Sequence, residues 1–267
     1  MVLLAGKRAL IMGVANKRSI AWGIATAFHR EGAELAFTYQ NERLKENLEE
    51  LLDGLGDRER FLTLPCDVQS DEQLAAAFDT LAQRWERLDA LAHCIAFAGR
   101  EELTRPFHEI SRGGYALTMD VSAYSLIAVA RHAARLMTDG GSILTLTYNA
   151  VERVVPGYSV MAVAKAALET EVRYLAAQLG PQQIRVNAIS AGPLKTLAGS
   201  AVKGISRLRD LTEQVAPLRR NITQEDVGDV AVFLASDLAR AVTGNIIFVD
   251  SGFHIMGVPA AGDREQT

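Results

Sequence analysis

The chain has 267 residues, of which 49% are hydrophobic and 22% charged, and its formal net charge is −4 at pH 7. This is the composition of a globular protein with a large core, and the length suits one domain. A negative chain without a local basic stripe is not built to wrap a polyanion, so we expect no nucleic-acid partner. Two isolated cysteines, Cys66 and Cys94, and scattered histidines predict neither a disulfide framework nor a metal site.

Short apolar runs typical of buried strands alternate along the chain with amphipathic stretches typical of helices. The expected strands are Lys7–Gly13, Glu34–Tyr39, Phe61–Pro65, Leu88–His93, Ser142–Tyr148, Arg185–Ser190 and Ile246–Val249. The expected helices are Ile20–Arg30, Glu42–Leu55, Ser70–Trp85 with a Ser70–Gln73 capping box, Tyr115–Met137, Tyr158–Leu179, and Thr223–Ala235 with Thr223 as its cap. This alternation predicts an α/β fold: a single doubly wound parallel sheet of the Rossmann type, with helices on both faces. Ligands of such sheets bind outside the carboxyl ends of the strands.

We expect one domain over residues 1–259 and a frayed polar tail over residues 260–267. Met1–Gly6 leads straight into a strand without the features of a signal peptide, and no apolar run is long enough to span a bilayer. These features predict a cytoplasmic protein with no membrane partner. Ala191–Asp210 is rich in glycine and weakly periodic, which predicts a long substrate-binding loop after the sixth strand.

The first strand is followed by the segment GVANKRSIAWG, residues 13–23. Small residues at positions 13, 15, 19 and 23 allow a tight turn and bring the first amides of the next helix against a pyrophosphate. The spacing is stretched relative to GxGxxG, and a plain strand-to-helix turn is the alternative interpretation.

Three further strand ends carry candidate cofactor contacts. After the second strand stands Gln40, whose amide can bond ribose hydroxyls. No Arg or Lys directly follows it to neutralise a 2′-phosphate, the nearest being Arg43, and this favours NADH over NADPH. After the third strand Asp67 can accept from an adenine amino group, although a turn residue would look the same. After the fourth strand the small residues 94–98 suit close contact with a ribose, and packing is the simpler interpretation for Cys94.

Chemistry-bearing residues follow the fifth strand. Tyr148 ends that strand, and Tyr158 and Lys165 lie seven residues apart on the expected next helix, on one side of it. A phenol beside an ammonium is expected to have a more accessible proton and to donate to an oxygen that becomes negative in a transition state. Such a spacing also occurs by chance, but the dinucleotide turn in the same chain favours function.

With these motifs, residues 2–257 closely resemble the bacterial NADH-dependent enoyl-acyl-carrier-protein reductases of the short-chain dehydrogenase/reductase superfamily. That branch has Tyr-x6-Lys where the superfamily has Tyr-x3-Lys, an extra tyrosine matching Tyr148, and a stretched first turn. Arg30–Asn41 and Arg185–Ala198 match it as well. The chain departs from the common pattern at Asn149, Ala150, Ala162 and Ser251. These departures leave acyl-chain preference and inhibitor sensitivity open.

The resemblance implies reduction of trans-2-enoyl thioesters by NADH in bacterial type II fatty acid elongation. It also implies an acyl carrier protein as partner and a homotetramer. The implied catalytic residues are Tyr158, Lys165 and Tyr148. The implied cofactor contacts are Gly13, Ser19, Ile20, Gln40, Asp67, Val68, Ile95, Lys165, Leu194 and Thr196. The implied substrate contacts are Ala98, Met161, Ala198, Val202 and Ile205, although Met161 and Val202 would look the same as core residues.

Two other functions stay open at this point. A carbonyl reductase would carry Tyr-x3-Lys, but Ala162 stands where that lysine belongs. A non-catalytic dinucleotide sensor could keep the fold, although the intact tyrosine and lysine set argues against it. The basic residues Lys203, Arg207 and Arg209 predict a docking patch for an acidic carrier protein, with a solvated helix face as the alternative.

Overall fold

The structure, a computed structural model, describes residues 2–56, 58–196 and 205–257. These residues form one sheet of seven parallel strands in the order β3-β2-β1-β4-β5-β6-β7. The strands are β1 (Arg8–Met12), β2 (Glu34–Tyr39), β3 (Leu62–Pro65), β4 (Ala90–His93), β5 (Gly141–Thr147), β6 (Ile184–Ala191) and β7 (Ile246–Val249). Strand order reverses between β1 and β4, so the predicted doubly wound sheet is confirmed.

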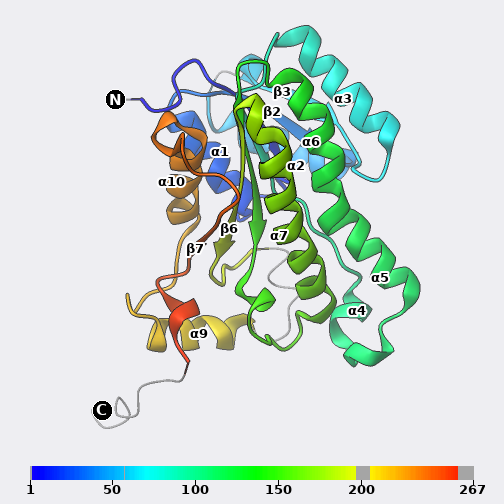
Figure 1. The fold of residues 1–267 in the computed structure, drawn as a ribbon, viewed down its shortest axis with the longest axis vertical. Coiled ribbons are helices and arrows are strands. Elements are labelled where there is room, and N and C mark those ends of the chain that lie inside the picture. Colours follow the sequence, from blue (N-terminus) through cyan, green and yellow to red (C-terminus); the bar gives the residue numbers. More distant parts are fainter. Residues whose placement is uncertain (1, 57, 197–204, 258–267) are drawn as a thin grey trace.

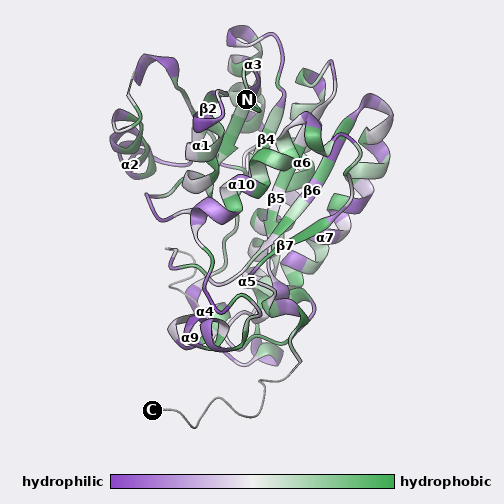
Figure 2. Cartoon of the chain, turned by 90° about the vertical axis from the view of Figure 1, so that its left-hand side faces the viewer, coloured by the Kyte–Doolittle hydropathy of each residue, from purple (hydrophilic) through white to green (hydrophobic). Residues whose placement is uncertain are grey.

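Six of the helices that the structure describes cover the sheet. On one face, α1 (Ile20–Arg30), α2 (Glu42–Asp53) and α10 (Gln224–Ala235) bury a core that includes Phe28 and Phe37. On the other, α3 (Asp71–Arg84), α6 (Ser125–Leu136) and α7 (Ser159–Leu179) bury a second core. Figure 1 shows α1 and α10 on one side of the strands and α6 and α7 on the other. Burial on both faces explains the near-continuous apolar runs of the strands, and Figure 2 shows these strands as hydrophobic.

Helices α1 and α10 approach each other closely through glycines. A Cβ on Gly23 would lie 2.6 Å from the Gln224 Cβ, and one on Gly228 would lie 2.7 Å from the Gly23 carbonyl oxygen. The missing side chain of Gly23 therefore makes room for α10, a reason for this glycine that the sequence did not indicate.

Among the described residues, three helices lie at the carboxyl edge of the sheet: α4 (Arg100–Thr104), α5 (Arg112–Met119) and α9 (Ile205–Val215). Figures 1 and 2 show them grouped at one end of the molecule. A π-helical turn, Asp120–Tyr124, joins α5 to α6, so the helix expected from Tyr115 begins at Arg112. The expected loop Ala191–Asp210 is wrong at both ends. Strand β6 includes Ala191, and α9 begins at Ile205.

The helix caps show one further correction. Thr223 forms a complete capping box with Asp226 at the start of α10. Ser70 accepts from the Gln73 amide at the start of α3, but the Gln73 side chain accepts from the Asp67 amide instead of completing a box. In the described part of the chain, no helix is both long and apolar enough to cross a membrane. The tail expected over residues 260–267 lies outside that part.

Candidate active site

Tyr148 and Tyr158 meet at the carboxyl edge of the sheet. Tyr148 directly follows β5, and Tyr158 is the residue before α7. Their ring centroids lie 4.9 Å apart with the planes at 59°. Burial raises the pKa of Tyr148 to about 12 and also raises the pKa of Tyr158. Both phenols therefore stay protonated at neutral pH and can act as hydrogen-bond donors.

Lys165 lies two turns into α7 and is only 4% exposed. Burial lowers its pKa to about 8, against the partial compensation of nearby Cys94, Glu171 and Glu169. A buried lysine whose pKa lies close to neutral pH, in a dinucleotide-type fold, is a candidate functional residue. The expectation that Lys165 makes the Tyr158 proton more acidic is wrong, because burial outweighs any such effect on the phenol.

The first turn is organised as a phosphate cradle would require. Gly13 follows β1 with φ of +93°, and a Cβ there would collide with the Cys94 carbonyl oxygen, so only glycine fits. The Ser19 hydroxyl accepts from the amides of Ala15 (3.2 Å) and Asn16 (3.1 Å) and donates to the Asn16 carbonyl. Ile20 opens α1 directly behind this turn. The turn therefore presents the start of α1 at the strand-order switch.

The ends of β2 and β3 are joined by side chains. The Gln40 amide nitrogen donates to the Asp67 carboxylate at 3.0 Å, and the same carboxylate accepts from the Gln69 amide. Asp67 is therefore a turn residue that also binds Gln40, and its contact with an adenine stays a prediction. Val68 and Ile95 pack against the same core from the ends of β3 and β4.

The expected substrate contacts are placed in part. Ala98 and Met161 belong to a small apolar cluster that also contacts Tyr158, which brings them to the candidate site. Leu194 packs against the first core, and the Thr196 amide donates to the Leu194 carbonyl at 2.9 Å. Ala198, Val202 and Lys203 lie outside the described residues, and for Ile205 only its place at the start of α9 is described.

Two departures from the family pattern have physical consequences. Ser251 adopts φ of +60°, which glycine occupies more easily, and its hydroxyl is buried without a partner. Asn149 follows Tyr148, and its side-chain oxygen is also buried without a partner. Ala150 is buried beside it.

The sequence reasoning missed a polar brace behind the loop that follows β4. His93 ends β4 fully buried, with one ring nitrogen 2.9 Å from the Ser125 hydroxyl and the other 3.1 Å from the Thr145 hydroxyl. Ser122, in the π-helical turn, binds both the amide and the carbonyl of Phe97 at 2.9 Å. A buried histidine at a strand end was the available signal, but the partners come from distant segments.

These features fit a dinucleotide. A glycine-only turn at the switch point, the Gln40–Asp67 pair after β2 and β3, and the buried Lys165 on α7 lie along the carboxyl edge of the sheet. The fold and the site define a nicotinamide-dependent oxidoreductase of the short-chain dehydrogenase/reductase class.

Comparison with known proteins makes this specific. A family model described as enoyl-(acyl carrier protein) reductase matches residues 13–254. An enoyl-(acyl-carrier-protein) reductase (NADH) of Bacillus cereus is 56% identical over 257 residues, which is 96% of this chain and 100% of that protein. A Nostoc protein of the same name is 52% identical over 261 residues, which is 97% of this chain and 100% of the Nostoc protein.

A solved structure agrees. The Bacillus cereus enoyl-acyl carrier protein reductase crystallised with NADP+ and an indole naphthyridinone is 55% identical, covers 97% of this chain and 100% of that chain, and superposes with a TM-score of 0.94. The chain belongs to the enoyl-(acyl carrier protein) reductase family.

Proposed function

We propose that the chain reduces the carbon–carbon double bond of trans-2-enoyl thioesters in bacterial fatty acid elongation, with NADH as the reductant. The observation that carries the chemistry is the pair of half-buried, protonated phenols at the start of the helix that carries the buried Lys165. Family membership supports the reaction class.

In this account Tyr158 donates a hydrogen bond to the thioester carbonyl. The oxygen of that carbonyl becomes negative as hydride arrives at the β-carbon, so a fixed donor stabilises the transition state more than the ground state. A phenol that stays protonated suits this role, because it stabilises the oxygen without first losing its proton. Tyr148, whose ring packs on Tyr158, limits the orientations available to that phenol.

The chain's own residues would hold the cofactor at both ends. Gly13, Ser19 and Ile20 would contact the pyrophosphate, and Lys165 would donate to the nicotinamide ribose. Gln40, Asp67, Val68 and Ile95 would surround the adenosine, and Leu194 and Thr196 would contact the nicotinamide side. When bound, NADH supplies the hydride.

A direct assay of NADH oxidation tests this proposal. NADH oxidation on addition of a crotonyl thioester, without oxidation on addition of ketones, supports it. Oxidation with ketones alone would point to a carbonyl reductase, and NADH binding without turnover would point to a sensor.

The partner, the assembly and the compartment belong to the same proposal. We expect the substrate to arrive on an acyl carrier protein in the cytoplasm. We expect a homotetramer, because α5, the π-helical turn and α7 expose the aromatic side chains Tyr115, Tyr124 and Tyr174 that subunit contacts would bury. Light scattering that shows a monomer at micromolar concentration would overturn the tetramer.

A further inference from the structure

An apolar wall flanks Tyr158 on the side of α4 and α5. Leu103 in α4 is buried against Val160 and Met161 of α7, and Tyr158 contacts the same cluster. Ile110, from the segment between α4 and α5, packs there as well. The segment that carries Leu103 and Ile110 thus forms one side of the space beside the candidate catalytic phenol.

A buried carboxylate holds this segment together. Glu102, next to Leu103, is 7% exposed, yet it carries a charge. One of its oxygens accepts from the Ser111 hydroxyl at 2.7 Å and the other from the Ser111 amide at 3.0 Å, and Arg105 lies 3.6 Å away. These hydrogen bonds hold the pKa of Glu102 below its usual value. The carboxylate therefore joins α4 to the N-cap residue of α5.

Ser111 completes the connection. Its hydroxyl also accepts from the Gly114 amide at 2.9 Å, so it caps α5. A Cβ on Gly114 would lie 2.4 Å from the Glu102 side chain, so any residue other than glycine in the first turn of α5 would displace this carboxylate from its present position.

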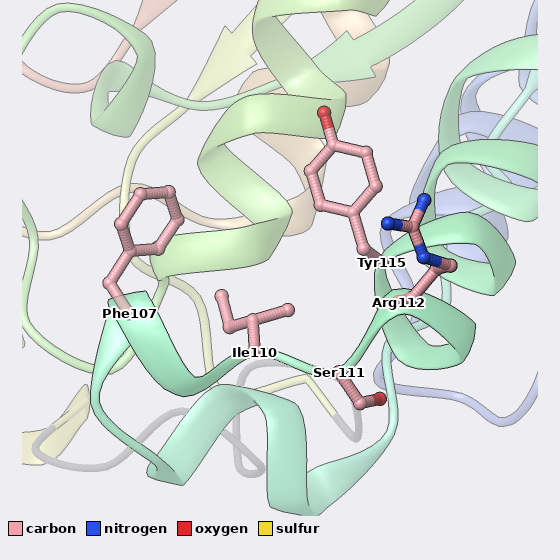
Figure 3. Close-up of a pocket in the computed structure, with 5 residues that line it drawn as sticks. All are labelled: Phe107, Ile110, Ser111, Arg112 and Tyr115. Carbon is pink, nitrogen blue, oxygen red and sulfur yellow. The ribbon is translucent and has the colours of Figure 1, made fainter.

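The same segment also lines an open pocket. A pocket of about 340 Å³ is lined by Phe107, Ile110, Ser111, Arg112 and Tyr115. Figure 3 shows Phe107, Ile110 and Tyr115 pointing to one side of this segment, whereas Ser111 points away from them. Ile110 therefore packs against the cluster of Leu103, Val160 and Met161 and also lines this pocket, so part of its side chain is not covered by protein. The hydrogen bonds of Ser111 to Glu102 fix the backbone next to it.

We propose that Glu102 is a positioning residue that, through Ser111, fixes Leu103 and Ile110 as the wall of the acyl site and thereby sets chain-length preference. This inference rests on the proposed function, since it places the acyl chain beside Tyr158. Loosening the wall should weaken contacts with a long chain, while a short chain that ends near the thioester depends less on them.

The test compares kcat/KM for dodecenoyl- and crotonyl-coenzyme A in two variants. In Glu102→Gln one of the two accepting oxygens becomes an NH2 group, which faces a Ser111 donor and cannot accept from it, and in Ser111→Ala the hydroxyl is lost. For each variant we expect the dodecenoyl-to-crotonyl ratio to fall about ten-fold, the lower end of the range by which apolar pocket contacts discriminate substrates.

Glu101→Gln is the matched control, because Glu101 is one residue away on α4 with its side chain 87% exposed. It should leave the ratio unchanged. The melting temperature of every variant is measured as well, so that an effect on the substrate ratio can be told apart from a loss of fold stability. A lower melting temperature with an unchanged ratio, or an equal loss on both substrates, would overturn the proposal. Failure of the parent enzyme to reduce either thioester would instead overturn the proposed function.

Discussion

The rings of Tyr148 and Tyr158 pack against each other at 4.9 Å, although one follows a strand and the other precedes a helix. Burial keeps both hydroxyls protonated, so the site offers two neutral donors and no phenolate. Only one of them is expected to reach the substrate oxygen, and the other supports it. The two tyrosines should therefore differ sharply when each loses its hydroxyl.

Tyr158→Phe should lower kcat by a factor of about 100 or more, the usual effect of removing a donor to a developing oxyanion. Tyr148→Phe should lower it much less, because the ring that packs on Tyr158 is kept. Steady-state kinetics with crotonyl-coenzyme A checks both. If Tyr148→Phe proves the more damaging change, the two roles are reversed.

Lys165 should impose a pH dependence. Its pKa is lowered to about 8 by burial, so the ammonium loses its proton as pH rises through 8. Because kcat/KM reports the free enzyme, it should decline above about pH 8. In Lys165→Arg the guanidinium stays charged, and the decline should vanish from whatever activity remains. A flat parent profile between about pH 7 and 10 would contradict this.

The titratable neighbours of Lys165 decide whether another group could cause this pH dependence. Burial holds the pKa of Cys94 at about 12 and that of His93 at about 3, so neither titrates in this range. Burial raises the pKa of Glu171 to about 7, and Glu171→Gln should remove only changes near that pH. The same Lys165 shift makes stability rise with pH between about 8 and 10.5, since the unfolded chain binds the proton more tightly there.

The strands were predictable to within two residues at each end because parallel strands buried on both faces need continuous apolar runs. The helix α9 was missed because its buried face carries Thr212, which is 1% exposed, where a periodic pattern would have an apolar residue. The start of α5 was missed because Gly113 and Gly114 disfavour a helix, and Gly114 is explained only by its tertiary contact with Glu102.

The candidate site was predictable in its residues and not in its environment. The spacing of Tyr158 and Lys165 places both on or beside one helix, as the structure has them. Their shifted pKa values depend on burial by segments distant in sequence. Glu102 and His93 were missed for the same reason, because their partners Ser111, Ser125 and Thr145 come together only in the folded chain.

Cofactor preference should follow the adenosine end. The Gln40–Asp67 pair places a carboxylate where a 2′-phosphate would add negative charge, and the exposed Arg43 is the nearest cation along β2 and α2. We expect kcat/KM to be higher for NADH than for NADPH. The relative crystallised with NADP+ makes the comparison worth measuring. A preference for NADPH would show this reasoning to be mistaken.

Carrier-protein docking should depend on charge near α9. Arg207 is exposed on that helix, Arg209 is half-buried, and Lys203 lies outside the described residues. A Lys203→Glu/Arg207→Glu variant should slow reduction of carrier-bound substrate at low salt, because rim charges act mainly on association. Coenzyme-A substrates should be barely affected. An equal loss on both would assign these residues to the pocket or the fold.

Ser251→Gly should stabilise the fold by about 1 kcal/mol, because it relieves a left-handed backbone and removes an unpartnered buried hydroxyl. The adjacent Gly252 has φ of +83°, and a Cβ added there would lie 2.9 Å from Pro217 Cγ, so Gly252→Ala should destabilise the fold. Denaturant unfolding measures both. A loss of stability in Ser251→Gly would contradict the idea that the backbone of Ser251 is strained.

The central claim, hydride delivery to the β-carbon of an enoyl thioester, is tested most directly by following the hydrogen itself. Crotonyl thioester would be turned over with NADH deuterated at both C4 positions, and the product analysed by mass spectrometry and NMR. The account predicts a saturated butyryl thioester with a single deuterium at the β-carbon. Deuterium on a carbinol carbon, with the double bond retained, would contradict it.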